Sequence, residues 1–109
     1  MSYKVKTIDV FERQAKRLSK KHFSLRDDLL QLVSELEENP EQGTSIGKNC
    51  FKIRLAISSK GKGKSGGARV ITNFVVVENT VYLLSIYDKS EKENLTDKEL
   101  SELLEHIPE

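Results

Sequence analysis

At residue 50 the spacing of apolar residues along the chain changes. Before this point they recur every three or four positions, which is typical of amphipathic helices. After it they occupy every second position as far as Ile57, which is typical of a half-buried strand. Lys52 and Arg54 fall between these apolar positions, so both are expected on the face turned away from the core. A chain with the two periods in separate blocks is expected to form an α+β domain.

Two amphipathic helices are expected before residue 50. The first follows a short strand at residues 5–8, and Asp9 is placed to cap it. The second opens at Ser24, which forms a capping-box pattern with Asp27, and it ends at an Asn-Pro pair. Because only a short break at residues 22–23 separates the two helices, they are predicted to pair as an αα-hairpin.

Two more strands are expected after the first alternating run, at residues 69–77 and 80–87. Thr96 and Glu99 then form a second capping-box pattern, which opens a C-terminal helix. The predicted order is βααβββα, an antiparallel sheet packed by an N-terminal helical hairpin and a C-terminal helix. At 109 residues the chain is expected to form a single domain, residues 1–109.

Every charged residue between positions 48 and 69 is basic, although the formal net charge of the chain is only +1. These residues are Lys48, Lys52, Arg54, Lys60, Lys62, Lys64 and Arg69. Charge gathered in this way attracts polyanions such as nucleic acid. The Gly-Lys-rich loop alone fits a flexible, solvated connection equally well. The cations on the adjoining strands, Lys52, Arg54 and Arg69, favour a nucleic-acid site, because strand residues are held in place.

Several other kinds of site are disfavoured. The GKGKS run at 61–65 lacks the glycine that a P-loop requires at position 58, where Ser58 stands, and no helical pattern follows. Two distant histidines and one cysteine do not form a zinc-binding pattern. Cys50 lies in an apolar strand, so we expect a structural cysteine in a reducing cytoplasm. No apolar run approaches the roughly 20 residues of a membrane span, and no metal, cofactor or membrane partner is expected.

With these elements in order, the sequence resembles the RelE/ParE superfamily. FKIRL at 51–55, the basic Gly-rich loop and GARVI at 67–71 look like the central hairpin of that superfamily. LSIYDKSE at 84–91, followed by NLT at 94–96, is similar to its HigB-like members. The resemblance covers roughly residues 3–107, and the KGKSGGAR loop with the YDKS strand end is its most specific part.

The resemblance implies a toxin of a type II toxin–antitoxin module. RelE-like and HigB-like members of the superfamily cut mRNA in the ribosomal A site, whereas ParE-like members poison DNA gyrase. In the RNA-cutting branch, basic residues on the second and third strands hold and activate the scissile phosphate. By resemblance, Lys52, Arg54 and Arg69 take these positions, and Lys89 takes the basic position that ends the last strand.

The chain departs from both RNA-cutting patterns. RelE-type members have a catalytic tyrosine a few residues after that basic position, but residues 91–96 contain none. HigB-type members often use a histidine at the strand end, where this chain has Tyr87, Asp88 and Lys89. Tyr87 is therefore the hypothetical proton donor or base-stacking residue, and Lys52 or a loop lysine is the expected base. The cations expected to contact nucleic acid without catalysing the reaction are Lys48, Lys60, Lys62 and Lys64.

The sequence thus predicts a metal-independent, ribosome-dependent endoribonuclease, or mRNA interferase, in the cytoplasm. Its expected partners are the ribosome, mRNA and a cognate antitoxin that covers the basic face or the surface around the helices. Operator DNA is expected only as a partner of the toxin–antitoxin complex. Two alternatives stay open: a ParE-like gyrase inhibitor of the same fold, and a nucleic-acid-binding module without catalytic activity.

Overall fold

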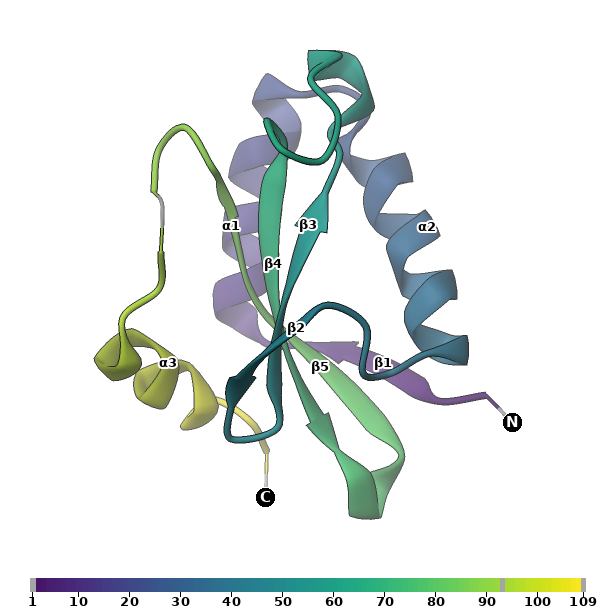
Figure 1. Ribbon diagram of the computed structural model, residues 1–109, viewed down its shortest axis with the longest axis vertical. Coiled ribbons are helices and arrows are strands. Elements are labelled where there is room, and N and C mark those ends of the chain that lie inside the picture. The colour runs from purple at the N-terminus through teal and green to yellow at the C-terminus, as the bar shows by residue number, and fades with distance from the viewer. Residues whose placement is uncertain (1, 93, 109) are drawn as a thin grey trace.

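The computed structural model describes residues 2–92 and 94–108. Its main elements, in chain order, are β1 (Lys4–Thr7), α1 (Asp9–Lys21), α2 (Leu25–Glu38), β2 (Thr44–Gly47), β3 (Cys50–Leu55), β4 (Ala68–Val75), β5 (Thr80–Asp88) and α3 (Asp97–Leu104) (Figure 1). Two short 3-10 turns, η1 (Ser58–Lys60) and η2 (Val76–Glu78), follow β3 and β4. The predicted α+β fold is confirmed, with one strand more than the sequence pattern indicated.

The additional strand is β2, which pairs antiparallel with β3 at the edge of a five-stranded sheet of order β1-β5-β4-β3-β2. Its four residues are too few to display alternation, and the strand exists because it pairs with β3. The sheet is antiparallel from β2 to β5, as predicted, and differs only at the other edge. There β1 runs parallel to β5, with Val5 opposite Val81, because the helical hairpin separates β1 from the rest of the sheet.

The helix starts follow the sequence pattern in one case and differ in another. Thr96 and Glu99 form the predicted capping box of α3, with reciprocal side-chain and backbone hydrogen bonds. Asp9, predicted to cap α1, is instead the first helical residue, and Ile8 occupies the N-cap position without a side-chain bond. The Asp9 carboxylate accepts a hydrogen bond from the backbone N–H of Val10 at 3.0 Å. A first-turn carboxylate still interacts favourably with the helix dipole.

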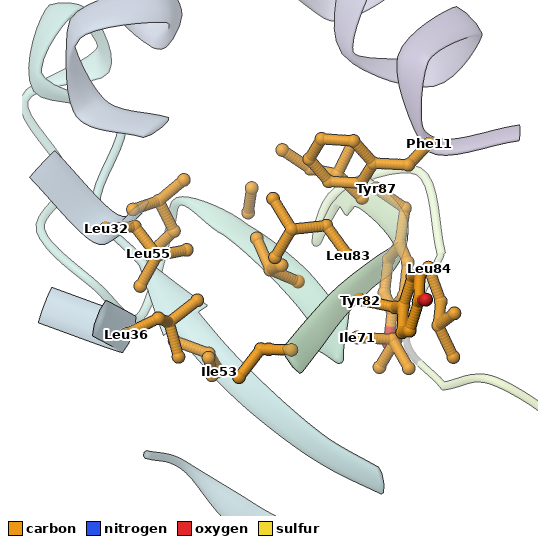
Figure 2. Close-up of a cluster of buried hydrophobic side chains, with 14 of the residues drawn as sticks. Phe11, Leu32, Leu36, Ile53, Leu55, Ile71, Tyr82, Leu83, Leu84 and Tyr87 are labelled. Carbon is orange, nitrogen blue, oxygen red and sulfur yellow. The ribbon is translucent and has the colours of Figure 1, made fainter. Parts of the chain in front are cut away.

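The core lies between the helical hairpin and one face of the sheet. Figure 2 shows Leu32 and Leu36 of α2 packed toward Ile53 and Leu55 of β3, and all four are buried. Phe11 of α1 covers β5 in the same way. Lys52 and Arg54 alternate with the buried Ile53 and Leu55 of β3, so they lie on the opposite face of the sheet. The helix α3 contacts β5 and, through Ser101, the turn between β2 and β3. Within residues 2–92 and 94–108, no helix is long and apolar enough to cross a bilayer.

Candidate nucleic-acid interface

A row of three candidate functional side chains crosses the face of the sheet opposite the helical hairpin. Arg54 of β3, Arg69 of β4 and Tyr87 of β5 are direct register partners on adjacent strands. Directly paired residues of an antiparallel sheet lie on the same face, so all three belong to one surface. Lys52 shares this surface two positions along β3, opposite Ile71. The strands therefore bring Lys52 and Arg54 together as predicted, with Lys52 half-buried and Arg54 exposed.

Lys52 and Arg54 open onto a cavity of about 430 Å³ that contains a third cation, Lys64 from the loop. We call this cavity the basic pocket; it is lined by Gln42, Gly43, Thr44, Lys52, Ile53, Arg54 and Lys64. None of the lining side chains is acidic. A smaller cavity of about 150 Å³ adjoins it, also lined by Arg54 and Lys64, and contains Asp28 and Glu35. Three cations around one concavity without a carboxylate form a suitable site for a phosphate group.

Arg69, expected to contact a phosphate, is buried beneath the loop and is 6% exposed. Its Nη1 donates to the backbone carbonyls of Lys64 and Ala68, each at 3.0 Å. Its Nη2 donates to the carbonyl of Ser65 at 3.4 Å. Because these bonds use donors on both terminal nitrogens, the geometry supports a different role for Arg69. It fixes the path of the loop that carries Lys64.

The loop between β3 and β4 is also tied down where it begins. The backbone N–H and the hydroxyl of Ser58 donate to the carboxylate of Asp28 in α2, at 3.0 and 2.6 Å. Ser24 accepts a hydrogen bond from the Ser59 N–H at 2.8 Å and donates to Asp28. Burial disfavours the charged form of Asp28, but the bonds from Ser58 and Ser24 outweigh it, and its pKa lies below the ordinary value. The predicted capping box between Ser24 and Asp27 does not form, because the Ser24 hydroxyl serves the loop instead.

The remaining predicted cations fall into two groups. Lys62, Lys64 and Lys89 are exposed, and none forms an ion pair within the described part of the chain. Lys48 is exposed and donates to the Ser101 hydroxyl at 2.9 Å, so it lies beside α3. Lys60 differs from all of these, because its side chain is 14% exposed and ion-paired. It is thus less available to nucleic acid than its place in a Gly-Lys loop suggested.

Tyr87 does not reach the basic pocket. It is 5% exposed, and its hydroxyl is buried without a hydrogen-bond partner in the described residues. Burial raises the pKa of the phenol; Arg69 nearby opposes this effect and Glu99 of α3 adds to it. The ring lines a separate cavity of about 230 Å³ beneath α3, together with Gln14 and Leu103. In this arrangement Tyr87 could act on RNA only after α3 had moved aside.

Sequence reasoning missed Asp88, a buried carboxylate at the end of β5 that binds Lys60. Because Lys89 is its neighbour in the sequence, Asp88 was expected to form a solvated ion pair there. No sequence pattern indicates that its partner is Lys60, 28 positions earlier. Cys50 is fully buried, and burial raises the pKa of its thiol, as expected of a structural cysteine. No group of three His, Cys, Asp or Glu side chains in residues 2–92 and 94–108 is arranged to hold a metal ion.

Comparison with known proteins identifies relatives of the whole domain. A family model described as the RelE toxin of the RelE/RelB toxin–antitoxin system matches residues 5–107. A mutant of the E. coli toxin RelE, solved in the free state, is 18% identical and superposes with a TM-score of 0.66, covering 99% of this chain and 100% of that one. The toxin of the intact E. coli RelBE toxin–antitoxin complex is 20% identical with a TM-score of 0.60 over 80% and 96% of the chains. A chain of the RelBE2 toxin–antitoxin complex of Mycobacterium tuberculosis is 15% identical and superposes with a TM-score of 0.59, covering 81% of this chain and 92% of that one.

Proposed function

This chain belongs to the RelE toxin family, and from that premise we propose that it is a ribosome-dependent endoribonuclease that cuts mRNA in the A site. The observation that carries the proposal is the basic pocket, in which Lys52, Arg54 and Lys64 line one cavity that contains no carboxylate. A surface that only attracted RNA would need no such convergence of strand and loop residues. Three cations that line one cavity suit the stabilisation of charge that develops on a phosphate.

The proposed reaction is an attack of the RNA 2′-oxygen on the adjacent phosphorus. The bond to the 5′-oxygen breaks, the proton of the 2′-hydroxyl leaves through a base, and an acid protonates the 5′-oxygen. Arg54 can hold two phosphate oxygens at once, because its planar guanidinium matches their geometry. Lys64 adds charge from the loop side. These two residues stabilise the doubly negative phosphorane, and the step requires no metal ion.

The base that receives the proton of the 2′-hydroxyl is assigned within the same pocket. Lys52 is half-buried on β3 and lines the basic pocket together with Arg54 and Lys64, so we propose it as the base. Lys89, which the family resemblance predicts as a catalytic residue, is exposed just after the end of β5 and does not line the basic pocket, so we propose it as a contact to the RNA backbone instead. The ribosome would hold the mRNA in a reactive geometry and thus reduce the demand on this small site.

A cognate antitoxin is the proposed protein partner. The solved E. coli and M. tuberculosis relatives were crystallised as toxin–antitoxin complexes, which supports such a partner for this chain. We propose that the antitoxin neutralises the toxin in the cytoplasm and that operator DNA is bound only by the two proteins together.

Primer extension on a defined mRNA in a reconstituted translation system tests the proposal. The wild-type chain, Arg54→Ala and a matched control, Lys20→Ala, are compared with and without ribosomes. Lys20 is an exposed cation of α1 and lies outside the basic pocket. We expect cuts at A-site codons that require ribosomes, persist in Lys20→Ala and disappear in Arg54→Ala. Intact mRNA under conditions in which a known interferase cuts would overturn the proposal.

One observation favours a second function, nucleic-acid binding without cleavage. The Tyr87 hydroxyl, a candidate proton donor, is enclosed beneath α3 and separated from the basic pocket. If the wild-type chain binds and protects mRNA without cutting it, the protein is a nucleic-acid-binding module without catalytic activity. A DNA supercoiling assay with gyrase, run in parallel, tests the ParE-like alternative, which predicts inhibition of gyrase together with intact mRNA.

A further inference from the structure

Asp88 has a buried carboxylate, around which groups from four segments of the chain lie close together. Both of its oxygens accept hydrogen bonds from Lys60 Nζ, at 3.0 and 3.1 Å. Ser90 donates to it twice, from the backbone N–H at 2.9 Å and from the hydroxyl at 2.8 Å. His22 Nε2, from the turn between α1 and α2, lies 3.4 Å away without hydrogen-bond geometry. Asp88 thus joins the helical hairpin, the loop after β3, the end of β5 and the turn that follows it.

The pair that Asp88 forms with Lys60 is well shielded from water. The Asp88 side chain is 7% exposed and that of Lys60 is 14% exposed. Burial disfavours an ionised carboxylate, but the bonds from Ser90 and Lys60 outweigh it and lower the pKa of Asp88 to about 2. The group therefore stays charged near neutral pH. Removing one partner of such a pair leaves a buried charge uncompensated, so its effect on local structure is large.

The loop after β3 depends on this pair for its middle contact. It is held at its start by Asp28 and at its end by Arg69, which binds the carbonyls of Lys64 and Ser65. Gly61 and Gly63 between these points adopt the left-handed conformation, with φ of 68° and 65°. Such residues turn the chain sharply but do not by themselves fix its direction. Lys60, next to Gly61, supplies the side chain that does.

The loop ends in the basic pocket, because Lys64 lines that cavity together with Arg54 and Lys52. Two lysines of the same loop thus differ in exposure and in ion pairing. The ammonium of Lys60 is turned inward onto Asp88, and Lys64 is left exposed for a ligand. Figure 1 shows this loop folded over the ends of β3 and β4, beside the turn between α1 and α2.

We propose that Asp88 is a positioning residue of the phosphate site: it binds Lys60, and through Lys60 it fixes the loop so that Lys64 faces Arg54 across the basic pocket. Asp88 acts without touching the RNA, since it does not line the pocket. The inference rests on the proposed function in one respect, that the basic pocket receives an RNA phosphate. It adds a residue that places the cations rather than one that reacts.

Asp88→Asn tests this inference, because it removes the charge and keeps the shape. The matched control is Asp27→Asn, which neutralises an exposed carboxylate of α2 that forms no ion pair within the described residues. Two properties are measured on each purified protein. One is backbone hydrogen exchange of residues 58–67, which does not depend on activity. The other is the affinity for a fully 2′-O-methylated single-stranded RNA, which cannot be cut, over a series of salt concentrations.

In Asp88→Asn we expect the acceleration of exchange, relative to wild type, to be larger in the loop than in β4 and β5. We also expect weaker RNA binding, and a salt dependence whose slope of log Kd against log salt falls by about 0.7, the share of one phosphate contact on a single strand. Lys60→Met should give the same two changes, and Lys60→Arg should restore both. The double variant Lys60→Met with Asp88→Asn should be no worse than either single change, because the two residues act as a pair.

The outcomes separate this inference from the proposed function. If wild type binds the RNA and Asp88→Asn has unchanged loop exchange or an unchanged salt slope, the positioning role is wrong and the pocket stands. If wild type does not bind the RNA, the proposed phosphate site itself is wrong. The positioning role of Asp88 is then wrong as well, whatever the hydrogen exchange of the loop shows. Should Asp88→Asn not fold, Lys60→Met and Lys60→Arg decide the question, since their side chain belongs to the loop.

Discussion

The guanidinium of Arg69 donates to the backbone carbonyl of Lys64 at 3.0 Å. The sequence predicted Arg69 as a catalytic residue and Lys64 as a contact to nucleic acid, whereas in the structure Arg69 supports the backbone of Lys64. The bond runs from the strand outward to the loop, so the buried cation determines where the exposed cation stands. This relationship predicts that Arg54 and Arg69, direct register partners in β3 and β4, respond differently to the same substitution.

Arg69→Ala is expected to lower the free energy of unfolding by about 1–3 kcal/mol, because it removes the guanidinium hydrogen bonds to three carbonyls at the loop. Arg54→Ala, at an exposed position, is expected to stay within about 0.5 kcal/mol of wild type and to lose RNA cleavage. Urea unfolding and primer extension on both variants check this. Unchanged stability in Arg69→Ala would show that the guanidinium is free to contact phosphate, as the family resemblance implies.

Gly67→Ala is expected to damage the loop from its other end. A Cβ atom at this position would collide with the backbone carbonyl of Leu55 and crowd the backbone of residues 56 and 57. Backbone atoms of a paired strand cannot move aside, so we expect a loss of about 1–3 kcal/mol in unfolding free energy. Ser65→Ala is the control, since the Ser65 hydroxyl makes no hydrogen bond within the described residues, and it should stay within about 0.5 kcal/mol. Equal stability of the two variants would contradict the close approach seen here.

The sequence predicted the helices and three central strands because their patterns are local. It did not predict β2, whose four residues become a strand only through pairing with β3. The same limit applies to the site. The alternation of β3 was enough to place Lys52 and Arg54 on one face, whereas the inward turn of Lys60 depends on Asp88, a residue 28 positions later. Contacts between distant segments leave no periodic signal, so a loop that looked flexible in the sequence is held in the structure.

Acid should weaken the fold through Asp88. Its pKa is lowered from 3.8 to about 2 in the folded protein, so its contribution is fully present above pH 3.8 and is lost as the pH falls toward 2. The shift corresponds to about 2 kcal/mol. Unfolding free energies measured from pH 6 down to pH 2 should therefore show Asp88→Asn less stable than wild type at the upper end, with the difference shrinking at the lower. A gap that stays constant across this range would rule out the lowered pKa as its cause.

Tyr87→Phe tests whether the buried phenol takes part in the reaction. Its hydroxyl is buried and unpaired among the described residues, so removing it discards an unsatisfied polar group. We expect the free energy of unfolding to stay equal or to rise by as much as about 1 kcal/mol. Because the hydroxyl lies outside the basic pocket, we also expect single-turnover cleavage on the ribosome to change by less than about tenfold, below the range of a lost general acid. A loss of about 100-fold or more at unchanged stability would mean that α3 moves aside on the ribosome and exposes Tyr87 to the leaving 5′-oxygen.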